Sequence, residues 1–372
     1  MSRHPLVSPL FKGLLTAGIL SLGALATAQA REPLEVVTSF SILDDMVSTI
    51  GGDHVEVSSL VGPDGDAHSF SPSPSDARTL ADADLVVVNG LQFEGWIDRL
   101  IDASGYDGDV VVASRGIEPL AFDGHHDEEP AGHTPADHDH DHDGHDHAST
   151  EHDHDDHDPA STEHDHDGHD HASAGHDHDD HDHDHAEAGH HHHGNLDPHA
   201  WQDLANGEQY ARNIRDALVK ADPAHADDYR ANAAHYIEQM KALDTEIRER
   251  LARIPEADRL IITSHDAFGY FAHAYGLELL APVGLNTQAE PSAGDMAELI
   301  RQIETSHAKA LFLENMSNPA LVRQLQEETG VAIGGTLYAD ALTADGEGST
   351  YLGMFRHNAD TLVAALTTPD KQ

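Results

Sequence analysis

Histidine is the residue that sets this 372-residue chain apart: there are 34 of them, and neutral imidazole is a ligand for divalent transition-metal ions. Ten of these histidines lie outside a tract rich in His and Asp, residues 124–194. Three of those ten, His68, His199 and His265, lie in loops next to expected strands or helices, and Asp340 also follows an expected strand. Each is a candidate metal ligand by position alone. The spacings between them are too long to form a local motif.

The His/Asp-rich tract, residues 124–194, is a second candidate for metal chemistry. It holds 24 of the 34 histidines and 23 of the 68 acidic residues, and it repeats itself, residues 141–149 recurring at 165–173. It has almost nothing apolar to bury, so we expect it to be disordered. Imidazoles and carboxylates two residues apart can chelate Zn²⁺, Ni²⁺ or Cu²⁺ in many equivalent ways. A purely solvating acidic linker is the alternative, but it would not need to alternate His with Asp.

The accessory metal-binding histidines that we predict in this tract are His138, His140, His142, His145, His147, His152, His154, His164, His166, His169, His171, His176, His178, His181, His183 and His185.

The overall composition excludes two classes of protein. The chain has 20 basic and 68 acidic residues, a formal charge of −48, so it does not bind nucleic acid by releasing counterions from phosphates. It has no cysteine, so no disulfide holds the fold.

The N-terminus predicts export. Arg3 and Lys12 precede an apolar run over residues 13–26, which ends in the small-x-small pattern Ala28-Gln29-Ala30. We expect a signal peptide over residues 1–30, cleaved after Ala30, and a free periplasmic protein, since there is no cysteine to carry a lipid. A membrane anchor is the alternative, but a span needs about 20 apolar residues.

Strand-like and helix-like segments alternate on both sides of the tract, which predicts mainly parallel α/β sheets. The expected strands are residues 34–40, 55–61, 84–89 and 109–113 before the tract, and 259–263, 278–282, 310–313 and 331–334 after it. The expected helices are residues 42–50, 74–81 and 93–103, one that begins at Ser292 with Asp295 three residues on, and one with Asn318 as cap, Pro319 as first residue and Gly330 past its end.

Residues 223–254 predict one long helix. Asp222-Pro223 is a start signal, apolar residues recur at helical spacing, and no Gly or Pro follows before Pro255. At 1.5 Å per residue this helix would be roughly 45 Å long, which suits a rigid connection between two lobes. We therefore expect a first lobe over residues 31–222 that includes the tract, a linking helix over 223–254 and a second lobe over 255–372.

Five segments resemble, in chain order, the motifs of the periplasmic zinc/manganese-binding proteins of ABC importers, the cluster A-I solute-binding family. They are residues 62–76, 89–96, 197–201, 264–271 and 337–340. The resemblance implies two Rossmann-like lobes joined by one long helix, with the metal site in the cleft between the lobes. It places the metal ligands on His68, His199, His265 and Asp340.

The resemblance also bears on the metal. Manganese-binding relatives have a carboxylate where this chain has His265, and three imidazoles with one carboxylate suit tetrahedral Zn²⁺. Relatives vary between a carboxylate and water at the position of Asp340. Glu290, Glu314 and Asp66 are acidic, lie near expected loops, and could substitute for a ligand or support one.

The function that follows is capture of Zn²⁺ and its delivery to the membrane permease of a zinc ABC importer, with the tract as accessory collector. We expect a monomer without enzymatic activity, and a periplasmic metallochaperone is a candidate second partner. A manganese carrier and a periplasmic zinc buffer or chaperone are the alternatives. A zinc hydrolase is disfavoured because the chain has no His-Glu-x-x-His motif and no carboxylate marked as a general base.

Overall fold

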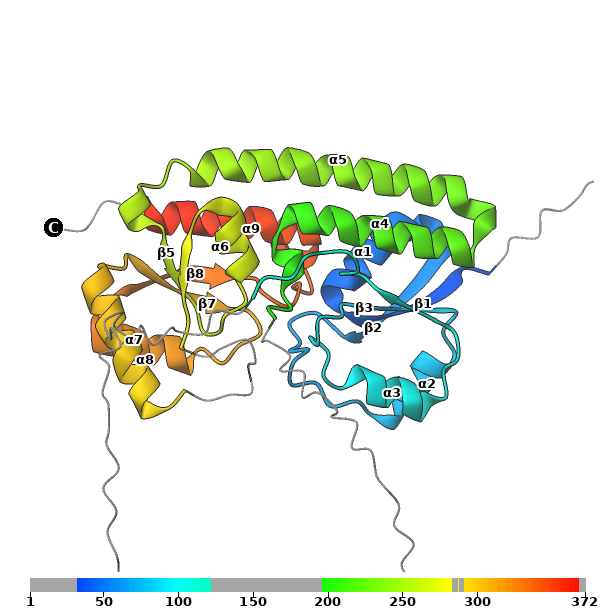
Figure 1. Cartoon of the computed structure of the whole chain (residues 1–372), viewed down its shortest axis with the longest axis horizontal. Helices are drawn as coiled ribbons and strands as arrows, with labels where there is room; N and C mark the ends of the chain where they lie inside the picture. The colour runs from blue at the N-terminus through cyan, green and yellow to red at the C-terminus, as the bar shows by residue number, and fades with distance from the viewer. Residues whose placement is uncertain (1–31, 122–195, 283–286, 288–290, 368–372) are drawn as a thin grey trace, which may run out of the picture. The chain divides into compact units, whose positions relative to one another are not determined.

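Two parallel β-sheets with the same strand order form the framework (Figure 1). In the first, the order is β2-β1-β3-β4, from β1 (Leu34–Phe40), β2 (Val55–Val61), β3 (Leu85–Val88) and β4 (Asp109–Val112). In the second it is β6-β5-β7-β8, from β5 (Leu260–Ile262), β6 (Glu278–Leu280), β7 (Ala310–Glu314) and β8 (Ala332–Leu337). The α/β class with two parallel-sheet lobes is therefore confirmed.

The computed structural model describes residues 32–121, 196–282, 287 and 291–367. The predicted signal peptide, the His/Asp tract with its accessory histidines, and Glu290 lie outside these ranges. Within them, no helix has both the length and the apolar composition needed to cross a bilayer.

Helices connect the strands and cover the sheets. They are α1 (Ser41–Gly51), α2 (Pro74–Ala81), α3 (Ile97–Ser104), α4 (Leu204–Ala221), α5 (Ala226–Leu251), α6 (Gly269–Tyr275), α7 (Ala293–Ser306), α8 (Ala320–Thr329) and α9 (Tyr351–Leu366). The predicted start signal of α7 is confirmed, because Ser292 and Asp295 form a capping box there. Ser73 and Asp76 form another capping box at α2, which was not predicted.

Helix α5 runs along both lobes (Figure 1). It packs against α1 and α4 of the first lobe and against α6 and α9 of the second. Its buried face includes Tyr236, Met240 and Leu243. The helix begins at Ala226, three residues later than predicted, because the Asp222 carboxylate bonds the ring of His225 and residues Pro223–His225 form a short 3₁₀ turn.

Two other predicted helix starts differ from the structure. Helix α3 begins at Ile97 instead of residue 93, because the buried carboxylate of Glu94 accepts hydrogen bonds from the amides of Asn89 and Gly90 and wraps the preceding chain into a loop. Helix α8 begins at Ala320, with Pro319 as its N-cap, although Asn318 does accept a bond from the Ala320 amide.

A half-buried carboxylate connects helices of the two lobes. Asp45 on α1 accepts a hydrogen bond of 2.9 Å from the backbone amide of Tyr351, the first residue of α9, and one of 3.3 Å from the hydroxyl of Tyr236 on α5. Burial raises the pKa of Asp45 to about 6, because these two bonds only partly replace lost water and Asp44 adds a nearby negative charge.

This carboxylate makes the stability of the metal-free protein depend on pH. Its pKa in the folded state, about 6, is above its ordinary value of 3.8, so its contribution to stability is present below about pH 4 and is lost as the pH rises through 6. Asparagine does not ionise, so we expect Asp45→Asn to remove this loss of stability. The unfolding free energy of the variant minus that of the wild type should then increase by about 2 kcal/mol from pH 4.5 to 7.5. Urea unfolding with chelator present measures this.

The control for this prediction is Asp98→Asn at an exposed position of α3, which should leave the pH dependence as it is in the wild type. An Asp45→Asn protein whose stability falls with pH as steeply as the wild type would contradict the prediction.

Candidate metal centre

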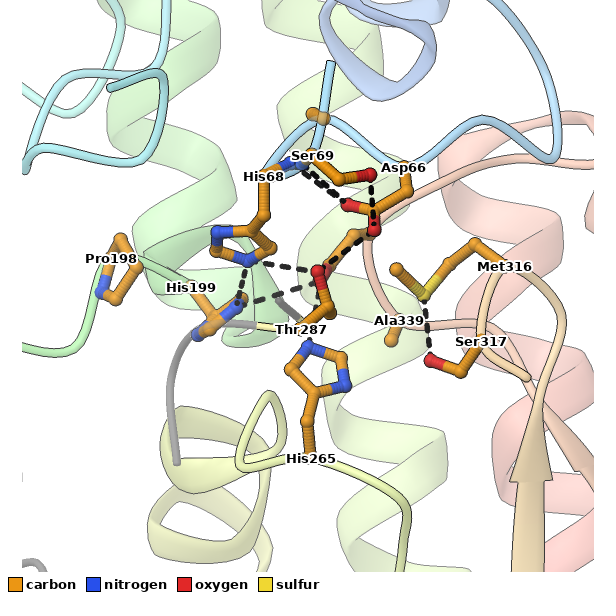
Figure 2. Close-up of polar contacts among 12 residues, drawn as sticks. Asp66, His68, Ser69, Pro198, His199, His265, Thr287, Met316, Ser317 and Ala339 are labelled. Carbon is orange, nitrogen blue, oxygen red and sulfur yellow. Dashed lines mark hydrogen bonds and ion pairs between the residues drawn. The ribbon is translucent and has the colours of Figure 1, made fainter. Parts of the chain in front are cut away.

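The structure brings together the four side chains to which the sequence pointed. His68 lies in the loop after β2, His199 lies just before the turn that leads into α4, His265 follows β5, and Asp340 follows β8. One nitrogen or carboxylate oxygen from each lies within 4.8 Å of the others. Figure 2 shows the rings of the three histidines gathered around one point. No other group of three or more such residues converges in the described part of the chain.

The separations between these atoms suit a tetrahedral cation. Nε2 of His68 lies 3.2 Å from Nε2 of His199 and 3.3 Å from Oδ2 of Asp340. Nε2 of His265 lies 3.1 Å from the same Oδ2, and Nε2 of His199 lies 3.6 Å from Oδ1 of Asp340. A tetrahedral ion with bonds of about 2.1 Å holds its ligand atoms about 3.4 Å apart. The cluster therefore has the size of a coordination shell.

Asp340 is a buried carboxylate with incomplete hydrogen bonding. The residue is 0% exposed, and its Oδ1 atom has no hydrogen-bond partner among the described residues. A buried carboxylate oxygen without a partner is costly, and a metal ion would satisfy it directly. The donor set of three imidazoles and one carboxylate thus fits a borderline divalent ion such as Zn²⁺.

Two buried carboxylates orient the imidazoles from behind. Asp197 Oδ1 lies 2.7 Å from Nδ1 of His199, and Glu314 Oε2 lies 2.5 Å from Nδ1 of His265. Glu314 also accepts hydrogen bonds from the backbone amides of Ser264 and His265. A proton held on Nδ1 leaves the lone pair of Nε2 free to point at the metal position.

These contacts decide the roles of the additional acidic candidates. Glu314 supports a histidine instead of entering the cluster. Asp66 accepts bonds from the backbone amides of His68 and Ser69, so it shapes the turn that carries His68. Asp197 was missed as a partner, although its position two residues before His199 in Asp-Pro-His was a usable signal.

Aromatic side chains form a wall on one side of the cluster. The ring of Phe93 lies edge-on to His68 at 4.6 Å between centroids, and Trp201 lies 5.3 Å from His199. The indole of Trp96 donates a 2.8 Å hydrogen bond to the carbonyl of Ala67 and so holds the peptide next to His68. Apolar walls of this kind exclude water and strengthen electrostatic interactions inside the site. A cavity of about 970 Å³ includes His265 in its lining.

The charges of the cluster are coupled. Burial alone would raise the pKa of Asp340, but the positive charge of His199 and His265 outweighs burial and holds it well below its usual value. Burial alone would lower the pKa of His265, but the carboxylates of Glu314 and Asp340 outweigh it and raise that pKa well above 6.5. Without a metal, protonated His265 therefore offsets part of the negative charge of its two carboxylate neighbours.

Comparison with known proteins shows the family to which the chain belongs. The family described as zinc-uptake complex component A, periplasmic, matches residues 36–365. The chain belongs to this family. It is thus a metal-binding, solute-binding component of the ABC-importer type, of cluster A-I, as the resemblance of its motifs implied.

Individual relatives differ in the metal that their names give. The manganese-binding lipoprotein MntA of Halalkalibacterium halodurans is 30% identical over 342 residues, covering 92% of this chain and 91% of its own. The iron-binding protein YfeA of Yersinia pestis is 28% identical, covering 95% and 94%. The structure of the periplasmic zinc-binding protein TroA from Treponema pallidum matches with a TM-score of 0.69 at 26% identity, covering 91% of this chain and 100% of that one. Family membership alone therefore does not decide the metal.

Binding of a divalent ion should release a proton. To bind Nε2 of His265, the ion must displace the proton that this nitrogen shares with Asp340. At pH values where His265 is protonated, the affinity for the ion should therefore fall by about tenfold for each unit by which the pH is lowered, for each proton displaced. Titration calorimetry of the first metal equivalent, in buffers of different ionisation enthalpy, counts these protons. Metal binding at pH 7 without release of a proton would contradict this prediction. So would a His265→Gln variant that releases as many protons on binding as the wild type does.

Removing the charge behind His265 should weaken the site without abolishing it. Glu314→Gln keeps the size and an acceptor oxygen but loses the negative charge that holds the proton on Nδ1. We expect the metal Kd to rise by roughly 10- to 100-fold. Competition with a chromophoric chelator measures the change, and Glu298→Gln on the exposed face of α7 is the matched control. Equal affinities in the two variants would show that Glu314 has no such role.

Proposed function

We propose that this protein captures one Zn²⁺ ion between its two lobes, with His68, His199, His265 and Asp340 as ligands, and delivers it to the membrane permease of a zinc ABC importer. The observation that carries the proposal is the convergence, within 4.8 Å, of three imidazole nitrogens and one buried carboxylate, of which one oxygen has no hydrogen-bond partner among the described residues.

The donor set favours zinc over manganese. Mn²⁺ prefers oxygen-rich shells, whereas imidazole nitrogen suits the borderline ion Zn²⁺. Three of the four donors here are nitrogens, each at the end of a ring whose position is fixed by its neighbours. Relatives named for manganese and iron make the choice of metal a matter for measurement, and the donor set is what supports zinc.

A binding role is also favoured over catalysis. A catalytic zinc site keeps one coordination position open for water. In this cluster Asp340 supplies the fourth donor. Two further carboxylates beside the cluster, those of Asp197 and Glu314, contact the Nδ1 atoms of histidines. Neither is free to act as a general base, so the site suits storage and release of an ion.

The remaining parts of the proposal come from the sequence. The His/Asp tract, through the accessory histidines named above, gathers zinc weakly and raises its concentration near the site. The protein acts as a periplasmic monomer after cleavage behind Ala30, with lobes over residues 31–222 and 255–372 and a linking helix over 223–254. A periplasmic metallochaperone is a candidate second partner.

Calorimetry of the full chain tests this function. We expect one tight Zn²⁺ event above several weak ones, with Mn²⁺ bound less tightly at the same site. Removal of residues 124–194 should abolish the weak events and keep the tight one, whereas His199→Ala should do the reverse. Weak events alone would support a zinc buffer, and a higher affinity for Mn²⁺ would support a manganese carrier.

A further inference from the structure

The loop that carries Asp340 belongs to the second lobe by sequence, but side chains of the first lobe hold it. The carbonyl of Ala339, next to Asp340, accepts two hydrogen bonds. One comes from Nε1 of Trp201 at 3.0 Å and the other from Nε2 of Gln202 at 2.6 Å. Both donors lie within three residues of His199. The segment that carries the candidate ligand His199 is therefore hydrogen-bonded to the backbone next to Asp340, another candidate ligand.

A second pair of bonds fixes the other side of Asp340. The amide of Leu342 donates to Oγ of Ser41 at 3.0 Å, and the carbonyl of Leu342 accepts from the amide of Asp64 at 2.8 Å. Ser41 begins α1 and Asp64 lies in the loop that carries His68. Asp340 is therefore tied on both sides to first-lobe segments that also position His68 and His199.

Gln202 is a buried amide whose hydrogen bonding is incomplete. It is 0% exposed, its Oε1 atom has no hydrogen-bond partner among the described residues, and the bond to Ala339 is the one that its amide nitrogen makes there. A buried amide with an unsatisfied oxygen costs free energy that an apolar side chain of similar size would not. Trp201 is different, because its ring also packs against Phe40 and Phe93 in the core.

We propose that Gln202 is a positioning residue for the metal site: its amide holds the Ala339 carbonyl so that the Asp340 carboxylate stays at the fourth coordination position before the ion arrives. This rests on the proposed function in that Asp340 is a metal ligand. Without the amide, Ala339 keeps only the indole bond, the loop gains freedom, and Asp340 must be ordered at the moment of binding.

The test is Gln202→Met, which keeps the volume and removes the donor. We expect the Kd for Zn²⁺ to rise roughly 10- to 100-fold, with one tight ion still bound per chain. With one equivalent of Co²⁺ in place of Zn²⁺, the visible absorption should lose the intensity typical of a tetrahedral site. The melting temperature of the metal-free protein should not fall, because the unsatisfied amide is gone. A purely structural role predicts the opposite: a lower melting temperature with normal affinity and spectrum.

Two further variants serve as controls. Gln209→Met changes a half-buried glutamine of α4 that bonds Asn213, away from the Asp340 loop, and should alter neither affinity nor spectrum. Ser41→Ala removes the acceptor on the other side of Asp340 and should weaken binding in the same direction. Ser41→Ala also keeps the proposal testable if Gln202→Met does not fold, since unchanged affinity in Ser41→Ala would then count against it.

A double-mutant cycle with Asp340→Ala separates this proposal from the assignment of ligands. If Gln202 acts through Asp340, Gln202→Met should have no further effect on affinity once Asp340 is alanine. An equal effect in both backgrounds overturns the positioning role while the ligand assignment stands. If Asp340→Ala leaves affinity unchanged, Asp340 is not a ligand and both are overturned. If the wild type prefers Mn²⁺, the zinc proposal fails, and the same cycle with Mn²⁺ still tests Gln202.

Discussion

The structure depends on the burial of negative charge. Asp340, Asp197 and Glu314 are all carboxylates removed from water, and no Lys or Arg side chain is paired with any of them among the described contacts. Imidazoles supply the compensation, as ring N–H donors to Asp197 and Glu314 and as an imidazolium beside Asp340. A divalent ion would supply the same compensation more completely, since it could contact four donors together. Folding alone leaves this charge imbalance only partly balanced.

The two sheets explain how such a cluster can be assembled from distant parts of the chain. In each sheet, the first strand in chain order lies between the second and the third. The connections that leave the first and third strands therefore run to opposite sides of the sheet, and this change of direction falls at the same place in both sheets. Loops at the carboxyl ends of parallel strands meet there, and ligands of α/β proteins bind at such points. His68, His265 and Asp340 all follow strands in this way, and His199 enters from the segment that leads into α4. The repeated topology places polar loops from both lobes against one another.

Local sequence patterns predicted the framework well because they depend on nearby residues. The helix start at Ser292 and the strand runs are of this kind. The late start of α3 was not predictable, because it depends on the buried Glu94 carboxylate bonding the amides that precede it. Helix α9 was absent from the predictions although a signal existed, with Thr350 capping an apolar helix. The bonds of Gln202 and Trp201 to Ala339 span more than 130 residues, and no local pattern encodes them.

The uninterrupted helix α5 has a mechanical consequence for the two lobes. Because it packs on helices of both lobes, wide separation of the lobes would have to bend a helix without Gly or Pro, or remove buried side chains such as Met240 and Leu243 from contact with their partners. Either change has a free-energy cost that small shifts of the lobes avoid. The helix therefore limits how far the lobes can move apart without loss of packing.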